Sequence, residues 1–382
     1  MPAMDKSLYQ ARLERFQKAY HGEIPDRIPI EGHFTPTFML SYCGYSLKTW
    51  DPDVVDRAVD RVLGEFDYDY VRSIFYRSPQ FFIQLGAKTF VQAEDGTMQH
   101  PDVHGLEPEE YPEFIADPYK TIVEKIVPRL YTELAKPSPY NAMAVAKAIF
   151  TNNMLREKFR VIQEKYQDKY SIPYTGGGML AAPFDFVADF IRGFNGISID
   201  IRRRPEQVLA ACEAVLPLMI KRGLSGPNGI TKTISMPLHM APYLKPADFE
   251  KFYWPTFKKL CEVMTENGYY LYIFFEHDWT RYLDYLQELP KGRIFAKFEY
   301  GDPKLIKEKL GKVVCISGLY PVALLKNGTK GECLKKAQEL IEILAPGGGY
   351  IFGLDKSIMK SSDINPENLK AVTQFIIREG KY

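Results

Sequence analysis

The chain of 382 residues has few cysteines, no excess of either charge and no long apolar run. Its five cysteines are odd in number and contain no Cys-x-x-Cys pair, which argues against a secreted, disulfide-bonded domain. The apolar runs fall short of the roughly 20 residues that a membrane-spanning helix needs, and residues 1–16 lack the apolar run of a signal peptide. These absences predict a reduced, cytoplasmic protein without a membrane anchor.

Lysine and arginine number 49 against 48 aspartate and glutamate residues, so the formal net charge is +1. Nucleic-acid-binding proteins usually carry a basic excess, and this balance therefore gives no support to a nucleic-acid partner. Hydrophobic residues make up 46% of the chain and charged residues 25%, as in ordinary globular proteins. The composition is that of an ordinary soluble globular protein.

Short apolar strands alternate with longer amphipathic segments along most of the chain, which is the pattern of a parallel α/β fold. A helix over residues 5–21 comes first. We predict one domain over residues 1–382, an α/β fold of the (β/α)₈ TIM-barrel class. The eight predicted strands are 27–31, 69–74, 170–174, 230–236, 269–275, 293–298, 313–317 and 350–353.

Residues 75–168 do not follow this alternation and are predicted to be an insertion of hairpin and helical segments. Residues 88–92 precede Asp95-Gly96, a dipeptide that favours the type I′ turn of a β-hairpin. Helices are predicted over 247–266 and 329–344, the second with Thr329 as its N-cap.

Seven short motifs follow one another in the order ERF (14–16), GEIPDRIP (22–29), IDIRRRPE (199–206), GLYP (318–321), LLKNGT (324–329), GGGYIF (347–352) and NPENL (365–369). Together they resemble the uroporphyrinogen decarboxylase superfamily over nearly the whole chain. The resemblance implies a TIM barrel and one of two chemistries. These are decarboxylation of uroporphyrinogen, and methyl transfer to or from a corrinoid protein, usually with zinc activating the methyl carrier.

Two departures from the superfamily's motifs separate these chemistries. Uroporphyrinogen decarboxylases carry an Arg-rich motif after the first strand, whereas residues 30–37 (IEGHFTPT) contain one acid and no arginine. A substrate with many carboxylates would meet a negative charge there and would find no arginine to pair with. The zinc-dependent thiol methyltransferases have a His-x-Cys pair and a late cysteine, but residues 270–279 and 353–357 contain no cysteine. The departures favour the methyltransferase branch, without its cysteine-rich zinc site.

Glu276, His277 and Asp278 form the most suggestive cluster because they follow a predicted strand at the end where barrel enzymes keep their chemistry. We predict Glu276 and Asp278 as catalytic groups, and these three residues with His239 as ligands of a possible zinc ion. Helix capping by Glu276 or Asp278 is the alternative. His33 is the further catalytic candidate, as a general acid or base; a structural histidine is the alternative reading.

Five residues are predicted to contact the substrate: Glu31, Gly177, Met179, Met236 and Trp279. The glycine run 176–178 could bring backbone amides close to an anion, or it could be a flexible loop. The methionines could line an adaptable pocket or fill the core.

The leading hypothesis is a methyltransferase that moves a methyl group from a small methoxylated or methylated substrate to a corrinoid. The chain lacks the Asp-x-His-x-x-Gly motif of cobalamin binding, so the corrinoid (cobalamin) would be supplied by a partner protein. One alternative is a decarboxylase or lyase that acts on a small organic acid without corrinoid. A non-catalytic ligand-binding barrel is the other. The resemblance also implies a homodimer.

Overall fold

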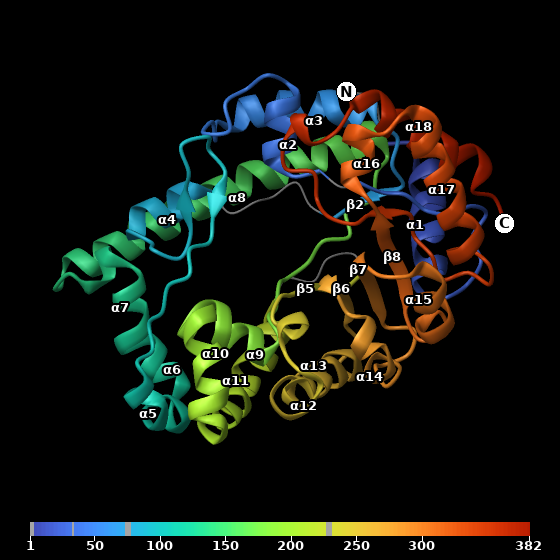
Figure 1. The fold of residues 1–382 in the computed structure, drawn as a ribbon. Helices are drawn as coiled ribbons and strands as arrows, with labels where there is room; N and C mark the ends of the chain where they lie inside the picture. Colours follow the sequence, from blue (N-terminus) through green and yellow to red (C-terminus); the bar gives the residue numbers. More distant parts are fainter. Residues whose placement is uncertain (1–3, 33, 73–77, 227–230) are drawn as a thin grey trace.

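The computed structural model describes residues 4–32, 34–72, 78–226 and 231–382, and its centre is a parallel five-stranded sheet (Figure 1). The strands run in the order β5-β6-β7-β8-β9, so each one pairs with its neighbour in the sequence. Parallel neighbours need a crossover connection, and the sequence supplies a helical segment between each pair. The strands are β5 (Thr233–Leu238), β6 (Tyr270–Asp278), β7 (Ile294–Tyr300), β8 (Cys315–Tyr320) and β9 (Gly353–Leu354).

Three further segments close this sheet into a barrel. The short strands β1 (Glu31–Gly32) and β2 (Tyr70–Val71) pair in parallel, and Ile30 bridges Phe352 beside β9. On the other side, Val71 bridges Tyr174, and Met179 bridges Ser235 of β5. All these bridges are parallel, so eight chain segments follow one another around a closed ring. The chain is therefore a (β/α)₈ barrel, which confirms the predicted fold class.

The predicted strands coincide with these segments, with differences at their ends. The predicted strand 170–174 is wrong at its start, because Tyr170 ends a helix and Ser171 turns the chain in the left-handed region at φ 52°. The barrel segment runs instead from Tyr174 to Met179. Residues 73–74 and 230, which end and begin two predicted strands, lie outside the described residues.

Alternation along the strands divides apolar side chains between two layers. Tyr272, Phe295 and Cys315 share a register level inside the barrel and form one cluster with Ile351 and Tyr70. Phe16, Ala19 and Tyr20 of α1 (Lys6–Tyr20) belong to the same cluster, and the Tyr20 hydroxyl donates to the Leu271 carbonyl at 3.0 Å. Helix α1 therefore closes the amino-terminal end of the barrel, and the opposite end is open for a site.

The outer layer packs helices against the other face of the strands. Thr329 caps α17 as predicted, with a reciprocal contact to Glu332. The predicted helix 247–266 is continuous but contains a π-helical stretch, Phe249–Tyr253. The helices between the barrel's first two strands are α2 (Pro36–Tyr42) and α3 (Pro52–Glu65). The helices that follow the insertion are α9 (Pro183–Phe186), α10 (Phe194–Arg203), α11 (Pro205–Leu224), α13 (Trp254–Glu266), α14 (Leu283–Leu286), α15 (Pro303–Leu310), α16 (Val322–Asn327), α17 (Lys330–Leu344) and α18 (Pro366–Glu379).

The predicted insertion is present and projects to one side of the barrel (Figure 1). Its hairpin is confirmed, but the turn is not type I′, since Gly96 has a φ of +88° and Asp95 does not share the positive sign. The insertion comprises α4 (Pro79–Leu85), β3 (Val91–Gln92), β4 (Met98–Gln99), α5 (Tyr111–Ala116), α6 (Pro118–Thr121), α7 (Val127–Leu130) and the 31-residue α8 (Tyr140–Tyr170). No helix in the described ranges has both the length and the apolar character to cross a membrane.

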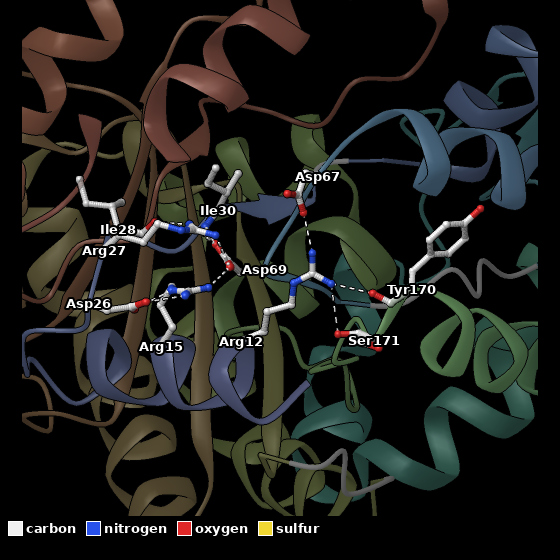
Figure 2. Close-up of polar contacts among 10 residues, drawn as sticks. All are labelled: Arg12, Arg15, Asp26, Arg27, Ile28, Ile30, Asp67, Asp69, Tyr170 and Ser171. Carbon is white, nitrogen blue, oxygen red and sulfur yellow. Dashed lines mark hydrogen bonds and ion pairs between the residues drawn. The ribbon is translucent and has the colours of Figure 1, made fainter. Parts of the chain in front are cut away.

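A buried ion network ties α1 to the first two barrel strands (Figure 2). The carboxylate of Asp69 is fully buried and accepts hydrogen bonds from Arg15, from both terminal nitrogens of Arg27 at 2.7 and 2.8 Å, and from the Ile30 amide at 2.8 Å. Arg15 also pairs with Asp26. Two cations and an amide thus compensate one buried anion.

We expect Asp69→Asn to destabilise the protein by about 3–5 kcal/mol, because it leaves two arginines around a neutral amide in a buried place. Urea unfolding followed by circular dichroism measures the change. The matched control is Asp67→Asn, which removes the partner of Arg12 at a carboxylate whose side chain is 58% exposed; this costs at most about 1 kcal/mol. Equal effects of the two substitutions would contradict the role assigned to Asp69.

Candidate functional site

The carboxyl end of β6, where Glu276 lies, carries a β-bulge. Phe275 pairs with Phe298 and Asp278 with Tyr300, so β6 has one residue more than β7 between these two pairs. His277 absorbs the irregularity in the left-handed region at φ 59°, and its amide donates to Glu299 at 2.9 Å. Bulges of this kind re-aim side chains beside active sites.

Glu276 meets His239, which follows β5, and Asp189, which lies in the π-helical stretch η4 (Val187–Arg192). His239 places Nδ1 2.8 Å from Asp189 Oδ2 and Nε2 3.2 Å from Glu276 Oε1. The imidazole therefore lies between two carboxylates, and both of its nitrogens have an acidic partner. We call Asp189, His239 and Glu276 the mouth triad.

The mouth triad holds His239 as a cation. Burial alone would lower the pKa of His239, but the hydrogen bonds and negative charges of Asp189 and Glu276 outweigh it and raise the pKa to about 11. At neutral pH the group is therefore an imidazolium.

A third carboxylate, Asp185, contacts the backbone beside the mouth triad. Its oxygens accept hydrogen bonds from the Met240 amide at 2.9 Å and the Tyr253 hydroxyl at 2.6 Å, and the side chain is buried. Burial and the nearby charge of Asp189 raise the pKa of Asp185 above its usual range. Asp185 fixes the backbone directly after His239 and thereby positions the imidazole.

Inside the barrel lies a second group of charges, formed by Glu31, Arg72 and Lys297, which we call the barrel triad. Glu31 is 1% exposed and accepts a hydrogen bond from the Tyr272 hydroxyl at 3.4 Å. The Arg72 guanidinium lies 3.7 Å above the Tyr272 ring and donates to the Ser235 hydroxyl. Lys297, in the middle of β7, is 3% exposed.

Burial sets the protonation of the barrel triad. It lowers the pKa of Lys297 to about 8; the charge of Arg72 acts in the same direction and that of Glu31 opposes both. Burial raises the pKa of Glu31, against the charges of Lys297 and Arg72 and the Tyr272 hydrogen bond. Glu276 of the mouth triad also acts on Lys297, which shows that the two triads lie within electrostatic reach of one another.

The register around Lys297 adds a buried hydroxyl. Lys297 pairs with Phe274 on one side and with Ser317 on the other. The Ser317 hydroxyl is fully buried and has no hydrogen-bond partner among the described residues, and the same holds for the Tyr70 hydroxyl. Buried hydroxyls are normally paired, so this part of the barrel interior offers polar groups to a bound polar molecule.

A cavity of about 220 Å³ opens beside the mouth triad. Asp189 and His239 supply its polar wall, with Arg222 of α11. His100 stacks on Phe90 with ring centroids 4.6 Å apart, which places the hairpin segment against this wall. Most of the remaining wall is apolar and includes Phe90, Met179, Leu180, Phe186, Phe190 and Met219. The cavity suits a small, partly aromatic or methylated molecule with one polar end.

Some of the predicted site residues lie together in the structure, and others do not. Glu276 and His239 meet in the mouth triad, Met179 lines the cavity and Glu31 belongs to the barrel triad. The structure places His277 on the surface, with Nε2 3.0 Å from the Tyr243 hydroxyl. Asp278 accepts the Thr280 amide at 2.8 Å, at the start of the 3₁₀ turn Thr280–Tyr282.

Two residues that were predicted to contact the substrate are buried away from the cavity. Met236 is fully buried in the outer core because strand alternation sends it away from the barrel interior, on the opposite face to Ser235. Trp279 is also fully buried; it packs on Phe275 and donates from Nε1 to the Glu276 carbonyl at 2.8 Å. It holds the β6 bulge in place and does not line the cavity.

Gly177 lies in the barrel wall between two hydrogen-bonded neighbours. The Gly176 amide donates to the Arg72 carbonyl at 2.6 Å, and the Gly178 carbonyl accepts the Ser235 amide at 2.9 Å. The glycine run is thus a barrel segment, and these groups are already paired. His33 lies outside the described residues. In the described part of the chain, no three His, Cys, Asp or Glu side chains gather as a metal-binding set, so the zinc site stays a prediction.

The sequence reasoning missed Asp185, Asp189, Arg72 and Lys297. A signal existed for Lys297, the one charge within the apolar run IFAKF of the predicted strand 293–298. In a strand that is buried on both faces, a lysine that points into the apolar outer core destabilises the protein. Its side chain is therefore expected to point into the barrel. Asp185 and Asp189 are four residues apart in FDFVAD and share one helical face, but nothing in the sequence links that face to His239.

Comparison with known proteins agrees with this architecture. The sequence profile of the family described as Uroporphyrinogen decarboxylase (URO-D) matches residues 122–378. Among solved structures, a methyltransferase from Methanosarcina mazei superposes with a TM-score of 0.62 at 14% sequence identity, over 95% of this chain and 97% of that chain. At this identity the superposition shows a shared fold. A search of curated proteins finds no match.

We expect the His239 imidazole to stay protonated from pH 6 up to at least pH 9, because two carboxylates stabilise its cation. Since the pKa is raised, the stability that the triad contributes is complete below about pH 6.5 and is lost as the pH rises toward 11. Histidine ¹⁵N NMR measures the titration, with His239→Gln to assign the signal.

In Glu276→Gln the pKa of His239 should fall, whereas Glu299→Gln, at the same mouth but without contact to His239, should leave it unchanged. A His239 signal that titrates near its ordinary value in the unsubstituted protein would disprove the triad.

Proposed function

Because the chain belongs to the uroporphyrinogen decarboxylase (URO-D) family of enzymes, we propose that it is a methyltransferase that moves a methyl group from a small methoxylated or methylated substrate to a corrinoid protein. The observation that carries the proposal is Lys297, a lysine buried inside the barrel with a pKa lowered to about 8. A general acid works best when its pKa lies near the working pH.

The barrel triad supplies the proton that demethylation of an ether or amine requires. As the bond from the heteroatom to the methyl carbon breaks, its electron pair stays on the heteroatom, which takes the proton of the Lys297 ammonium. The methyl carbon bonds to the corrinoid cobalt, which supplies the electron pair and is oxidised from Co(I) to Co(III). Glu31 stabilises the ammonium before transfer, and Arg72 disfavours it; the balance keeps the proton labile.

The mouth triad has a different task, which is to bind and orient. A permanent imidazolium between two carboxylates is a fixed charge pattern at the edge of the cavity. The aromatic wall formed by Phe90, Phe186 and Phe190 packs against the apolar part of the substrate. The methyl group then lies toward the open end of the barrel, where a partner protein has access.

Among the described residues, no three suitable donors gather as a zinc-binding set. The proposed reaction therefore contains no step through zinc, and the proton of Lys297 does the work of activating the leaving heteroatom.

We expect Lys297→Met to lower kcat for methyl transfer by roughly 10²- to 10⁴-fold, the usual contribution of a general acid. The rate of the unsubstituted enzyme should fall as the pH rises through about 8, where Lys297 loses its proton. Methylation of cob(I)alamin, with a panel of methoxybenzoates and methylamines as donors, gives the rate from the change in visible absorption.

The matched control is Lys307→Met. Lys307 is another lysine whose pKa is lowered by burial. Its ammonium donates hydrogen bonds to the Leu344 and Gly348 carbonyls, outside the barrel interior. Its loss should affect stability and leave the pH profile unchanged. Retention of the rate and of the alkaline limb in Lys297→Met would rule out the assigned role.

Decarboxylation or lysis of a small organic acid is the second candidate, and one observation favours it. Two cations, Arg72 and Lys297, flank a single buried carboxylate, and they would bind a substrate carboxylate. The carbon–carboxylate bond would break with release of CO₂, and the carbon would take the proton of Lys297. CO₂ release from small acids without corrinoid, together with no methyl transfer, would replace the first proposal with this one.

A further inference from the structure

Two adjoining cavities lie at the amino-terminal end of the barrel, beside the last turn of α1. Their volumes are about 330 and 220 Å³, and Tyr20 and His21 line both of them. The first cavity reaches Thr233 and Tyr270 at the starts of β5 and β6, and the second reaches Cys315 at the start of β8. Together they have the size of a small-molecule site, roughly 300–1,000 Å³. Neither cavity belongs to the candidate site at the opposite end of the barrel.

Four cations gather at these cavities. Lys232 lines the first cavity, and Lys291 and Lys312 line the second. The Arg293 guanidinium lies 4.8 Å from the centroid of the Tyr270 ring. None of the described lining residues is an aspartate or a glutamate, and within the described ranges these four cations form no ion pair with a carboxylate. The whole chain has 49 basic and 48 acidic residues, so the excess is local. Like charges in a cleft repel one another and attract an anion.

The backbone around the second cavity lets an anion approach closely. The Gly292 amide donates to the Val313 carbonyl at 2.9 Å, which holds the turn of Lys291 beside the turn of Lys312. Gly292 and Gly347 have φ values of +68° and +80°, and a Cβ atom at either position would meet no atom within 4 Å. The glycines therefore border open space, where a ligand can lie against the main chain. Lysines are point charges that suit phosphate oxygens, so the second cavity fits a chain of phosphates.

The first cavity has a different character, with aromatic rings and uncharged polar groups. Phe16, Tyr20 and Tyr270 contribute rings to its wall, and the last two meet edge to face with centroids 5.1 Å apart. The Gln17 amide and the Thr231 hydroxyl also line it, and they can donate and accept hydrogen bonds. A flat heteroaromatic ring with polar edges matches this combination, because its face packs on aromatic atoms and its edge meets the amide and the hydroxyl.

We propose that the two cavities form one binding site for a nucleoside diphosphate or triphosphate, with the base in the first cavity and the phosphates in the second. His21 lies at the junction, where its Nε2 is 2.7 Å from the Tyr270 hydroxyl. Since the cavities adjoin there, one molecule can occupy both. The inference does not depend on the proposed function, because no residue of the mouth triad or the barrel triad takes part.

Isothermal titration calorimetry of the full chain with ADP, GDP and UDP tests the proposal. At least one of them should bind with a Kd below roughly 1 mM. That nucleotide should bind at least roughly tenfold more tightly than its nucleoside or pyrophosphate, because each of these fills only one cavity. The double variant Lys291→Gln/Lys312→Gln should weaken binding of the nucleotide by at least roughly tenfold, since two phosphate partners are lost.

The matched control is Lys330→Gln. Lys330 is an exposed lysine at the first position of α17 and lines neither cavity, so its loss should leave the Kd unchanged. Circular dichroism establishes that each variant is folded. The absence of binding by all three nucleotides would overturn the proposal, and so would binding that survives Lys291→Gln/Lys312→Gln. Pyrophosphate that binds as tightly as the nucleotide would also overturn it, because the first cavity would then hold no base.

Discussion

The buried carboxylate of Asp69 is the constraint on which the barrel depends. It joins Arg15 of the closing helix, Arg27 before the first strand and the Ile30 amide in one place, so three chain segments have to arrive together (Figure 2). β1 and β2 contribute only two residues each to their ladder, too few hydrogen bonds to fix their register. The ion network fixes the register of these two strands at the amino-terminal end of the barrel. The carboxyl ends of the strands remain available to form the site.

Burial and neighbouring charges then set the protonation state of each charged group at the site. Inside the barrel, Lys297 is surrounded by protein on all sides and loses part of its preference for the charged form. At the mouth, His239 is half-buried, but its two carboxylate partners reverse the effect of burial. Lys297 therefore holds a proton that it can give up near neutral pH, whereas His239 keeps its proton. An acid that reacts and a cation that orients are needed together wherever a leaving group must be both held and protonated.

The sequence predicted the order of the barrel strands, the hairpin and the Thr329 cap, because each depends on residues close together in the chain. Glu276 and His239 were identified for a similar reason, since each follows a recognisable strand. Asp189 was missed because its contact with His239 spans 50 residues and depends on how η4 packs. Met236 and Trp279 were assigned to the site because residue type does not reveal which face of a strand or turn is inward. Strand alternation and the β6 bulge decide which face a residue occupies. No pattern in the sequence predicts the extra residue of the bulge.

That single extra residue in β6 connects the fold to the chemistry. Without it, the strand would continue its alternation past Phe275, and His277 would have no reason to enter the left-handed region. Trp279 fills the core beneath the bulge and donates to the Glu276 carbonyl, so the irregular backbone is held from the apolar side. Glu276 is then fixed at the mouth, where it both completes the pairing of His239 and adds negative charge above Lys297. The core packing of the Trp279 indole therefore contributes to the position of the Glu276 carboxylate through the backbone that carries it.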